Sequence, residues 1–276
     1  MKIVYVSDLH TNLKNYDELL IVVKKNKPDL LIIGGDIFPR GKVSDHINFA
    51  ENYLYNYFSK VKEIVPEAMI FFILGNDDWK DAEKSFAGIE EKGLAYYCNC
   101  KKVSLKNRFE IIGYSYVPPS PFKKKDFEKL DLKEDAIPLN PSEIYISRGG
   151  EVVVTNPSSH FSSVGTIEED LNLLPLPLDF SRSIYILHSP PFNTALDKVM
   201  NGLSVGSRSI RAFIEKKQPL LTLHGHIHES YSVTKRFYEK IGKTVSINAG
   251  QINLKVDAVI FDTEDIEGTI VHTNPL

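Results

Sequence analysis

The chain has 276 residues, of which 42% are hydrophobic and 25% are charged, so its composition is that of an ordinary soluble globular protein with one large domain or two small ones. Its formal net charge of -3 argues against nucleic acid or an anionic membrane as partners, because the chain has no strong positive field that would attract either of them. The sequence shows neither a secretory signal peptide nor an apolar run near the ~20 residues of a membrane span.

The two cysteines, Cys98 and Cys100, are separated by one residue. Cysteines one residue apart do not match the spacing of a structural zinc site, and they do not easily form a disulfide with each other. We therefore expect both thiols to be reduced and the protein to be cytoplasmic.

The first part of the chain alternates predicted strands with predicted helices. Apolar, β-branched runs predict buried strands over residues 2–8, 29–36 and 68–76. Apolar residues three and four positions apart predict helices over residues 12–26 and 44–65. This order of elements indicates a parallel sheet covered by helices.

The remaining chain is interrupted by an irregular segment. Residues 108–116 are predicted to form a strand, whereas residues 117–182 are dense in Pro and Gly, with a hairpin expected near residues 143–156. We interpret residues 117–182 as an insertion that caps a single domain of residues 1–276, and the lysines at 123–125 as a solvated surface. Regular structure then resumes, with a helix over 207–217 and strands over 183–191, 219–230, 244–250, 257–263 and 268–273.

Residues that can bind metal ions follow five of the predicted strands. The carboxyl ends of parallel strands share one edge of a sheet, so these side chains should converge although they are far apart in sequence. Each residue alone would more often be a turn, a helix cap or an interior histidine. Together they suit two ions ~3.5–4 Å apart that share a carboxylate, since there are too many ligands for one ion with an open position. The residues are Asp8, His10, Asp36, Asn76, His188, His226 and His228.

These residues lie in short motifs: DLH at 8–10, GGD ending at Asp36, GND around Asn76, the isolated His188, and GHIH at 225–228. In this order the motifs resemble those of the calcineurin-like metallophosphoesterase superfamily, and they extend over residues 8–228. The resemblance implies an α/β fold, a four-layer α/β/β/α sandwich of two mixed sheets, which accommodates the late strands.

The resemblance also implies a ligand set. Asp8, His10 and His228 would hold one divalent metal ion, and Asn76, His188 and His226 would hold the second, with Asp36 bridging the two. A bridging hydroxide would attack the phosphorus atom of a phosphate ester. The family pattern suggests manganese first, with iron, zinc, nickel or magnesium as alternatives, and histidine ligands argue against magnesium alone.

The chain departs from the family pattern at residue 77. Most members have His after the GN dipeptide, where it contacts the scissile phosphate, but here Asp77 and Asp78 follow Asn76. Some members that lack this His resemble phosphodiesterases, so we expect phosphodiester rather than monoester hydrolysis. Asp77 could protonate the leaving group if burial and the like charge of Asp78 keep it protonated, or His160 could reach over the site from the insertion. The alternatives are a turn residue for Asp77 and a surface-loop histidine for His160.

Arg208 and Arg211 lie in the first turns of the helix predicted at 207–217, where they could grip a phosphate or simply be solvated. The predicted substrate is a small-molecule or nucleotide-like phosphate ester. The competing hypothesis is a binding or scaffold protein that has this fold and little or no catalytic activity, although the complete ligand set argues against it. A nuclease would require a basic groove, which the sequence does not indicate.

Overall fold

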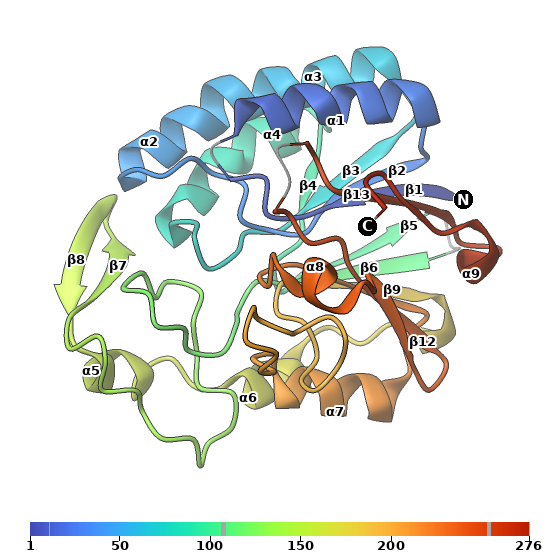
Figure 1. The fold of residues 1–276 in the computed structure, drawn as a ribbon. Coiled ribbons are helices and arrows are strands. Elements are labelled where there is room, and N and C mark those ends of the chain that lie inside the picture. Colours follow the sequence, from blue (N-terminus) through green and yellow to red (C-terminus); the bar gives the residue numbers. More distant parts are fainter. Residues whose placement is uncertain (11, 106–108, 253–254, 276) are drawn as a thin grey trace.

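The computed structural model describes residues 1–10, 12–105, 109–252 and 255–275. In these residues the strands form two six-stranded sheets and a separate two-stranded hairpin. The two large sheets face each other, with α1 (Leu13–Asn26) and α3 (Tyr55–Ile64) outside one and α6 (Ile167–Leu173) and α7 (Arg208–Lys217) outside the other (Figure 1). The structure therefore confirms the predicted four-layer α/β/β/α sandwich of two mixed sheets.

The first sheet contains the three early strands that the sequence predicts. Its order is β14-β13-β1-β2-β3-β4, in which β1 to β4 are parallel and β13 pairs antiparallel with both β1 and β14. The strands are β1 (Lys2–Val6), β2 (Leu30–Ile33), β3 (Met69–Phe72), β4 (Tyr96–Tyr97), β13 (Ala258–Asp262) and β14 (Val271–His272).

The second sheet has parallel strands in its centre and antiparallel strands at both edges. Its order is β11-β12-β10-β9-β6-β5, with β12, β10, β9 and β6 parallel. The strands are β5 (Lys102–Leu105), β6 (Phe109–Tyr114), β9 (Ser183–Leu187), β10 (Leu221–His224), β11 (Tyr238–Ile241) and β12 (Thr244–Asn248). The sequence did not indicate β4, β5 and β11, all of which are short.

Each central strand is buried on both faces, which explains its uninterrupted apolar sequence. In β1, Ile3 and Tyr5 belong to the core between the two sheets, whereas Val4 and Val6 face the core that includes helix residues such as Leu19. Successive side chains of a strand point to opposite faces, so one apolar run serves both layers.

The predicted helices are present, with one local difference. The helix expected over residues 44–65 is α2 (Val43–Asn48), a π-helical segment η1 (Phe49–Leu54) and α3 in direct succession. The sequence did not give the positions of several short helices, which are η2 (Lys80–Phe86), α4 (Ala87–Glu91), α5 (Pro157–Phe161), η3 (Phe180–Arg182), α8 (Ser230–Thr234) and α9 (Ile266–Thr269). Among the described residues, no helix is both long and apolar enough to cross a membrane.

The segment 117–182 contains the expected hairpin, formed by β7 (Ile144–Arg148) and β8 (Glu151–Thr155), together with α5 and α6. Phe127, Ile167 and Leu171 of this segment are buried in the same cluster as core residues of the sheets and helices. The segment is therefore fastened to the body of the protein by apolar packing.

The lysines at 123–125 do not form the solvated surface that was expected. Lys123 is exposed, but Lys125 is buried and its ammonium lies 2.6 Å from the Glu128 carboxylate. Lys124 is also largely covered, with 15% of its side chain exposed. The expectation was wrong because a run of like charges looks the same in sequence whether or not its members find partners.

Candidate active site

The predicted ligands lie just after the carboxyl ends of β1, β2, β3, β9 and β10, where loops from both sheets meet. Backbone hydrogen bonds join these loops directly. The Asp8 N–H donates to the Gly35 carbonyl at 3.0 Å, the His10 N–H donates to the Asp36 carbonyl at 2.8 Å, and the Gly225 N–H donates to the His188 carbonyl at 2.9 Å. The loops are thus held in register by main-chain contacts as well as by the side chains they carry.

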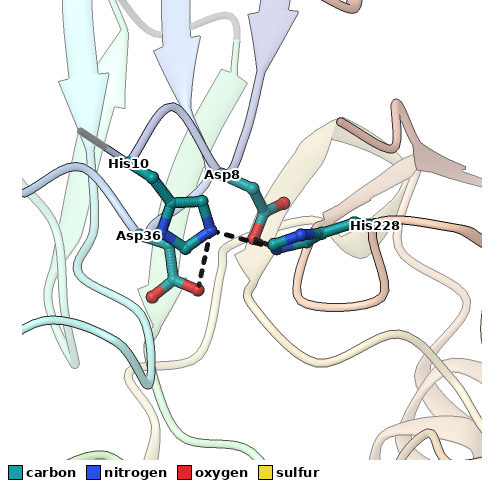
Figure 2. Close-up of side chains that lie close together, drawn as sticks. All are labelled: Asp8, His10, Asp36 and His228. Atoms are coloured by element: carbon teal, nitrogen blue, oxygen red, sulfur yellow. Dashed lines mark hydrogen bonds and ion pairs between the residues drawn. The ribbon is translucent and has the colours of Figure 1, made fainter. Parts of the chain in front are cut away.

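Four of the predicted residues form a tight group. Asp8, His10, Asp36 and His228 each offer one ligand atom, and these atoms all lie within 4.8 Å of one another (Figure 2). His228 Nε2 lies 3.2 Å from Asp8 Oδ1 and 3.1 Å from His10 Nε2. Three sequence-distant loops therefore place two carboxylates and two imidazoles around one point.

The other three predicted residues adjoin this group. His188 Nε2 lies 3.3 Å from Asp36 Oδ2 and 3.2 Å from Asn76 Oδ1. The rings of His226 and His188 have centroids 5.6 Å apart, and the His226 N–H donates to the Asp8 carboxylate at 3.0 Å. Since Asp36 Oδ2 is also 3.9 Å from His10 Nε2, Asp36 lies between the two sets of residues.

The orientation of His188 is set by the backbone. Its Nδ1 lies 2.8 Å from the Gly34 carbonyl, and both groups are buried. A carbonyl can only accept, so Nδ1 carries the proton and the Nε2 atom is directed toward Asp36 and Asn76. A hydrogen bond of this kind is what usually fixes the tautomer of a metal-binding histidine.

Several of these residues have strained backbones. Asp8, His10, Asp36 and His226 have φ angles of +57°, +43°, +52° and +67°. Residues other than Gly adopt this left-handed region uncommonly, and each such residue costs of order 1–3 kcal/mol. The loops keep these unfavourable conformations because their hydrogen bonds and side-chain contacts at the site hold them there.

The electrostatics of the group favour added positive charge. Burial acts to raise the pKa of the Asp36 carboxyl, but His188 and His10 together hold it well below its usual range. For His188 and His228, burial acts in the other direction and would lower the pKa of each imidazole. The neighbouring carboxylates outweigh it: Asp36 raises the pKa of His188 to about 9, and Asp8 raises the pKa of His228 to about 9. The buried carboxylates thus stabilise cations placed among them, as a metal-binding site requires.

Asp78 has a structural role. Its buried carboxylate accepts the backbone N–H groups of Ile37, Phe38 and Gly75 at 3.1, 3.0 and 2.9 Å. These bonds tie the loop after β2 to the loop after β3, and so hold Asp36 and Asn76 at a fixed separation.

Asp77 lies at the rim of the group. Its side chain is 40% exposed, with Oδ2 3.5 Å from His10 Nδ1 and Oδ1 3.5 Å from the ammonium of Lys124. Its backbone N–H donates to Asp36 Oδ1 at 2.7 Å. A carboxylate between two basic groups is placed to accept hydrogen bonds, so these contacts do not support the hypothesis that Asp77 donates a proton.

His160 is not a surface-loop residue, and its contacts do not lead to the site. It is buried in α5, where its Nε2 lies 3.3 Å from the Glu128 carbonyl of the same insertion. Figure 1 shows α5 beside the β7–β8 hairpin at the outer edge of the molecule. Its interactions are those of a residue that packs the insertion.

The start of α7 is already occupied by a carboxylate of the protein itself. Asp131, which is buried, accepts the Arg208 N–H at 2.6 Å and the Ser207 hydroxyl at 2.6 Å. The Arg208 side chain pairs with Asp135, and Arg211 Nε lies 2.6 Å from Glu215. The helix terminus and both arginines therefore have internal partners, which argues against the predicted phosphate grip.

We expect Asp131→Ala to lower the free energy of unfolding by about 2–4 kcal/mol, because it leaves buried N–H and O–H donors without an acceptor. Asp135→Ala is the matched control. It removes the partly exposed pair with Arg208 and one hydrogen bond from the Leu132 N–H, so it should cost about 1 kcal/mol, less than the loss of Asp131. Urea denaturation of both variants measures the difference, and equal losses would contradict the capping role of Asp131.

Sequence reasoning overlooked two residues beside the site. One is Lys124, which belongs to a run of lysines with no distinguishing sequence pattern. The other is Trp79, which follows Asp77 and Asp78 in sequence and whose ring centroid lies 4.3 Å from the Lys124 ammonium. The sequence also gave no indication of a role for Asn248, which lies at the end of β12. The buried Asn248 amide donates to the Gly225 and Ile227 carbonyls, each at 3.2 Å, and so holds the GHIH loop in place.

Comparison with known proteins assigns the family. The model of the calcineurin-like phosphoesterase family matches residues 1–230, which is most of the chain. The chain therefore belongs to the calcineurin-like phosphoesterase family. Membership suggests that it is a phosphoester hydrolase, and the group formed by Asp8, His10, Asp36 and His228 is a candidate metal site. No curated protein sequence matches the chain.

Solved structures support the fold. Two crystal structures have TM-scores of 0.62, each covering 100% of this chain and 99% of the other, at 15% and 13% identity. The second is TT1561 of Thermus thermophilus. A novel archaeal phosphodiesterase has a TM-score of 0.44 at 14% identity, covering 99% of this chain and 98% of the other. Of these, only the two structures with TM-scores of 0.62 support the fold, and at their identities the likeness concerns the fold alone.

Proposed function

We propose that the protein hydrolyses phosphate esters at this site, with two divalent metal ions as cofactors, and that it prefers phosphodiesters to monoesters. The observation that carries this proposal is the convergence of Asp8, His10, Asp36 and His228 on one point, with His188 and Asn76 adjoining it. Substrates would be small-molecule or nucleotide-like phosphate esters.

The residues fit a pair of metal ions. Asp8, His10 and His228 would hold one ion and Asn76, His188 and His226 the other, with Asp36 between them. The donors combine imidazole nitrogens with carboxylate and amide oxygens, a set that suits manganese, iron, zinc or nickel better than magnesium alone. We propose manganese because several oxygen donors accompany the imidazoles.

When bound, such ions supply positive charge that activates water and stabilises the charge developing on a phosphoryl group. The chain's own contribution is to hold that charge in place. The Gly34 carbonyl orients His188, Asp78 fixes the spacing of two loops, and Asn248 fixes a third. Such preorganisation matters because misplacement of catalytic groups by about 1 Å can cost roughly 10²-fold in rate.

The preference for phosphodiesters is supported by the rim of the site. Asp77 presents a carboxylate there, 3.5 Å from the ring of His10. A monoester carries close to two negative charges at neutral pH, and a diester carries one. A carboxylate near the bound phosphate repels the second charge, so it disfavours the monoester.

A direct test compares two chromogenic esters. The protein is freed of metal, reloaded with manganese, and assayed with bis(p-nitrophenyl) phosphate and p-nitrophenyl phosphate. We expect manganese-dependent hydrolysis with a higher kcat/KM for the diester. A preference for the monoester would overturn the substrate assignment, and no hydrolysis of either ester would instead favour a binding or scaffold protein.

A further inference from the structure

Lys124 is held by several contacts at the rim of the proposed site. Its ammonium donates to the Asp77 carbonyl, lies 3.5 Å from the Asp77 carboxylate, and sits 4.3 Å from the centroid of the Trp79 ring. Only 15% of the Lys124 side chain is exposed. Three partners on the loop after β3 thus fix a cation that comes from the insertion.

The insertion holds Lys124 in this position through its backbone. The Lys125 N–H donates to the Tyr145 carbonyl at 2.9 Å, and the Tyr145 N–H donates to the Lys123 carbonyl at 2.8 Å. The segment that carries Lys124 is thereby paired with β7 of the hairpin. A residue held from both sides in this way is not a mobile surface lysine.

A second set of bonds fastens the same segment to the loop after β3. The Asp126 carboxylate accepts the Lys80 N–H at 2.8 Å and the Ser147 N–H at 2.7 Å. Trp79 is itself fixed, because its indole N–H donates to the Gly41 carbonyl at 2.8 Å. The distance between Lys124 and Asp77 is therefore set by the fold.

The two charges are not equally close to the site. Asp77 Oδ2 faces His10 and Asp77 Oδ1 faces Lys124, so the carboxylate lies between the site and the ammonium. A phosphate bound at the site meets the negative end of the pair first. Lys124 offsets part of this repulsion, so the strength of the repulsion depends on both residues.

We propose that the Asp77–Lys124 ion pair sets the selectivity of the site, favouring phosphate esters with one negative charge over those with two. The inference rests on the proposed function and assigns a role to residues that lie beside the ligands. Because the Asp77 carboxylate lies nearer the site than the Lys124 ammonium, the intact pair still repels a second negative charge, and selectivity changes with the charges that remain at the rim. Removing Lys124's charge leaves one negative charge, removing Asp77's charge leaves one positive charge, and removing both leaves none.

The test is a double-mutant cycle on the manganese-loaded protein. Wild type, Lys124→Met, Asp77→Asn and the double variant are assayed with bis(p-nitrophenyl) phosphate and p-nitrophenyl phosphate. Relative to wild type, the ratio of monoester to diester kcat/KM should fall about tenfold in Lys124→Met and rise about tenfold in Asp77→Asn, the effect expected of one unit charge at a partly exposed rim. The double variant should lie between the two single variants.

Lys123→Met is the matched control. Lys123 is the preceding residue, is exposed, and lies over the Tyr145 ring at 5.4 Å rather than near Asp77. It loses the same charge from the same segment, so its ratio should match that of wild type. Lys124→Arg keeps the charge and should retain most of the wild-type ratio.

Failure of this inference and failure of the proposed function give different results. A ratio that stays within about twofold in all four proteins, while wild type hydrolyses the diester, would overturn the role of the ion pair alone. A wild-type protein that hydrolyses neither ester would overturn the function itself. Thermal unfolding shows whether Lys124→Met folds; if it does not, the ratio measured for Asp77→Asn decides, since its side chain is partly exposed.

Discussion

Replacing Asp36 with Asn should reduce phosphodiester hydrolysis by about a thousandfold or more, equivalent to ~4 kcal/mol of transition-state stabilisation. The Asp36 carboxylate is buried and lies 3.3 Å from His188 and 3.9 Å from His10, between the residues proposed to hold each ion. Asn has nearly the same shape and can still accept the Asp77 N–H through its oxygen. The change therefore removes charge from the centre of the site while leaving the loops in place.

Steady-state kinetics with bis(p-nitrophenyl) phosphate at saturating manganese measure this effect. Asp135→Asn is a suitable control. It also removes one carboxylate charge, but Asp135 lies in segment 117–182 and pairs with Arg208 of α7 rather than with the proposed ligands. The control should keep wild-type kcat. An Asp36→Asn protein with more than a tenth of wild-type activity would show that Asp36 is not at the centre of the chemistry.

Gly75→Ala should abolish hydrolysis and destabilise the fold. A Cβ atom at residue 75 would overlap with Asp36 Oδ1 and His188 Nε2, both of which belong to buried, tightly placed side chains. Overpacking of this kind typically costs about 1–3 kcal/mol, and here it also displaces two of the proposed ligands. The fall in activity should exceed what the loss of folded protein explains.

Gly88→Ala provides the comparison. Gly88 lies in α4, where an added Cβ meets nothing within 4 Å, so the substitution should be neutral or stabilise the protein by about 0.5–1 kcal/mol. Urea denaturation and activity assays of both variants give the two readouts. Near wild-type activity in Gly75→Ala would mean that Asp36 and His188 need not hold their observed positions.

The strand-end residues were predictable because their signal is both local and topological. Asp8, Asp36 and His188 each follow an apolar run, and parallel strands end at a common edge, so their convergence could be inferred without coordinates. The sandwich of two sheets did not follow from periodicity. It was implied by the family resemblance, and the alternation of Ile3 and Tyr5 with Val4 and Val6 between two cores explains it afterwards.

The insertion was the part that sequence could not resolve. Lys124 acquires its role from a β7 backbone pairing and from the ring of Trp79, neither of which has a local sequence pattern. The contacts at the start of α7 were hidden from the sequence for a related reason. The helix start and the arginines looked free in sequence, but Asp131 reaches the helix from a position 77 residues away.

Metal stoichiometry tests the central claim most directly. The metal-free chain is loaded with manganese, passed through a desalting column, and its metal content is measured by mass spectrometry beside that of Asp36→Asn. We predict close to two ions per wild-type chain and clearly fewer in the variant. A wild-type chain that retains no manganese, or a variant that retains as much as wild type, would contradict a metal pair centred on Asp36.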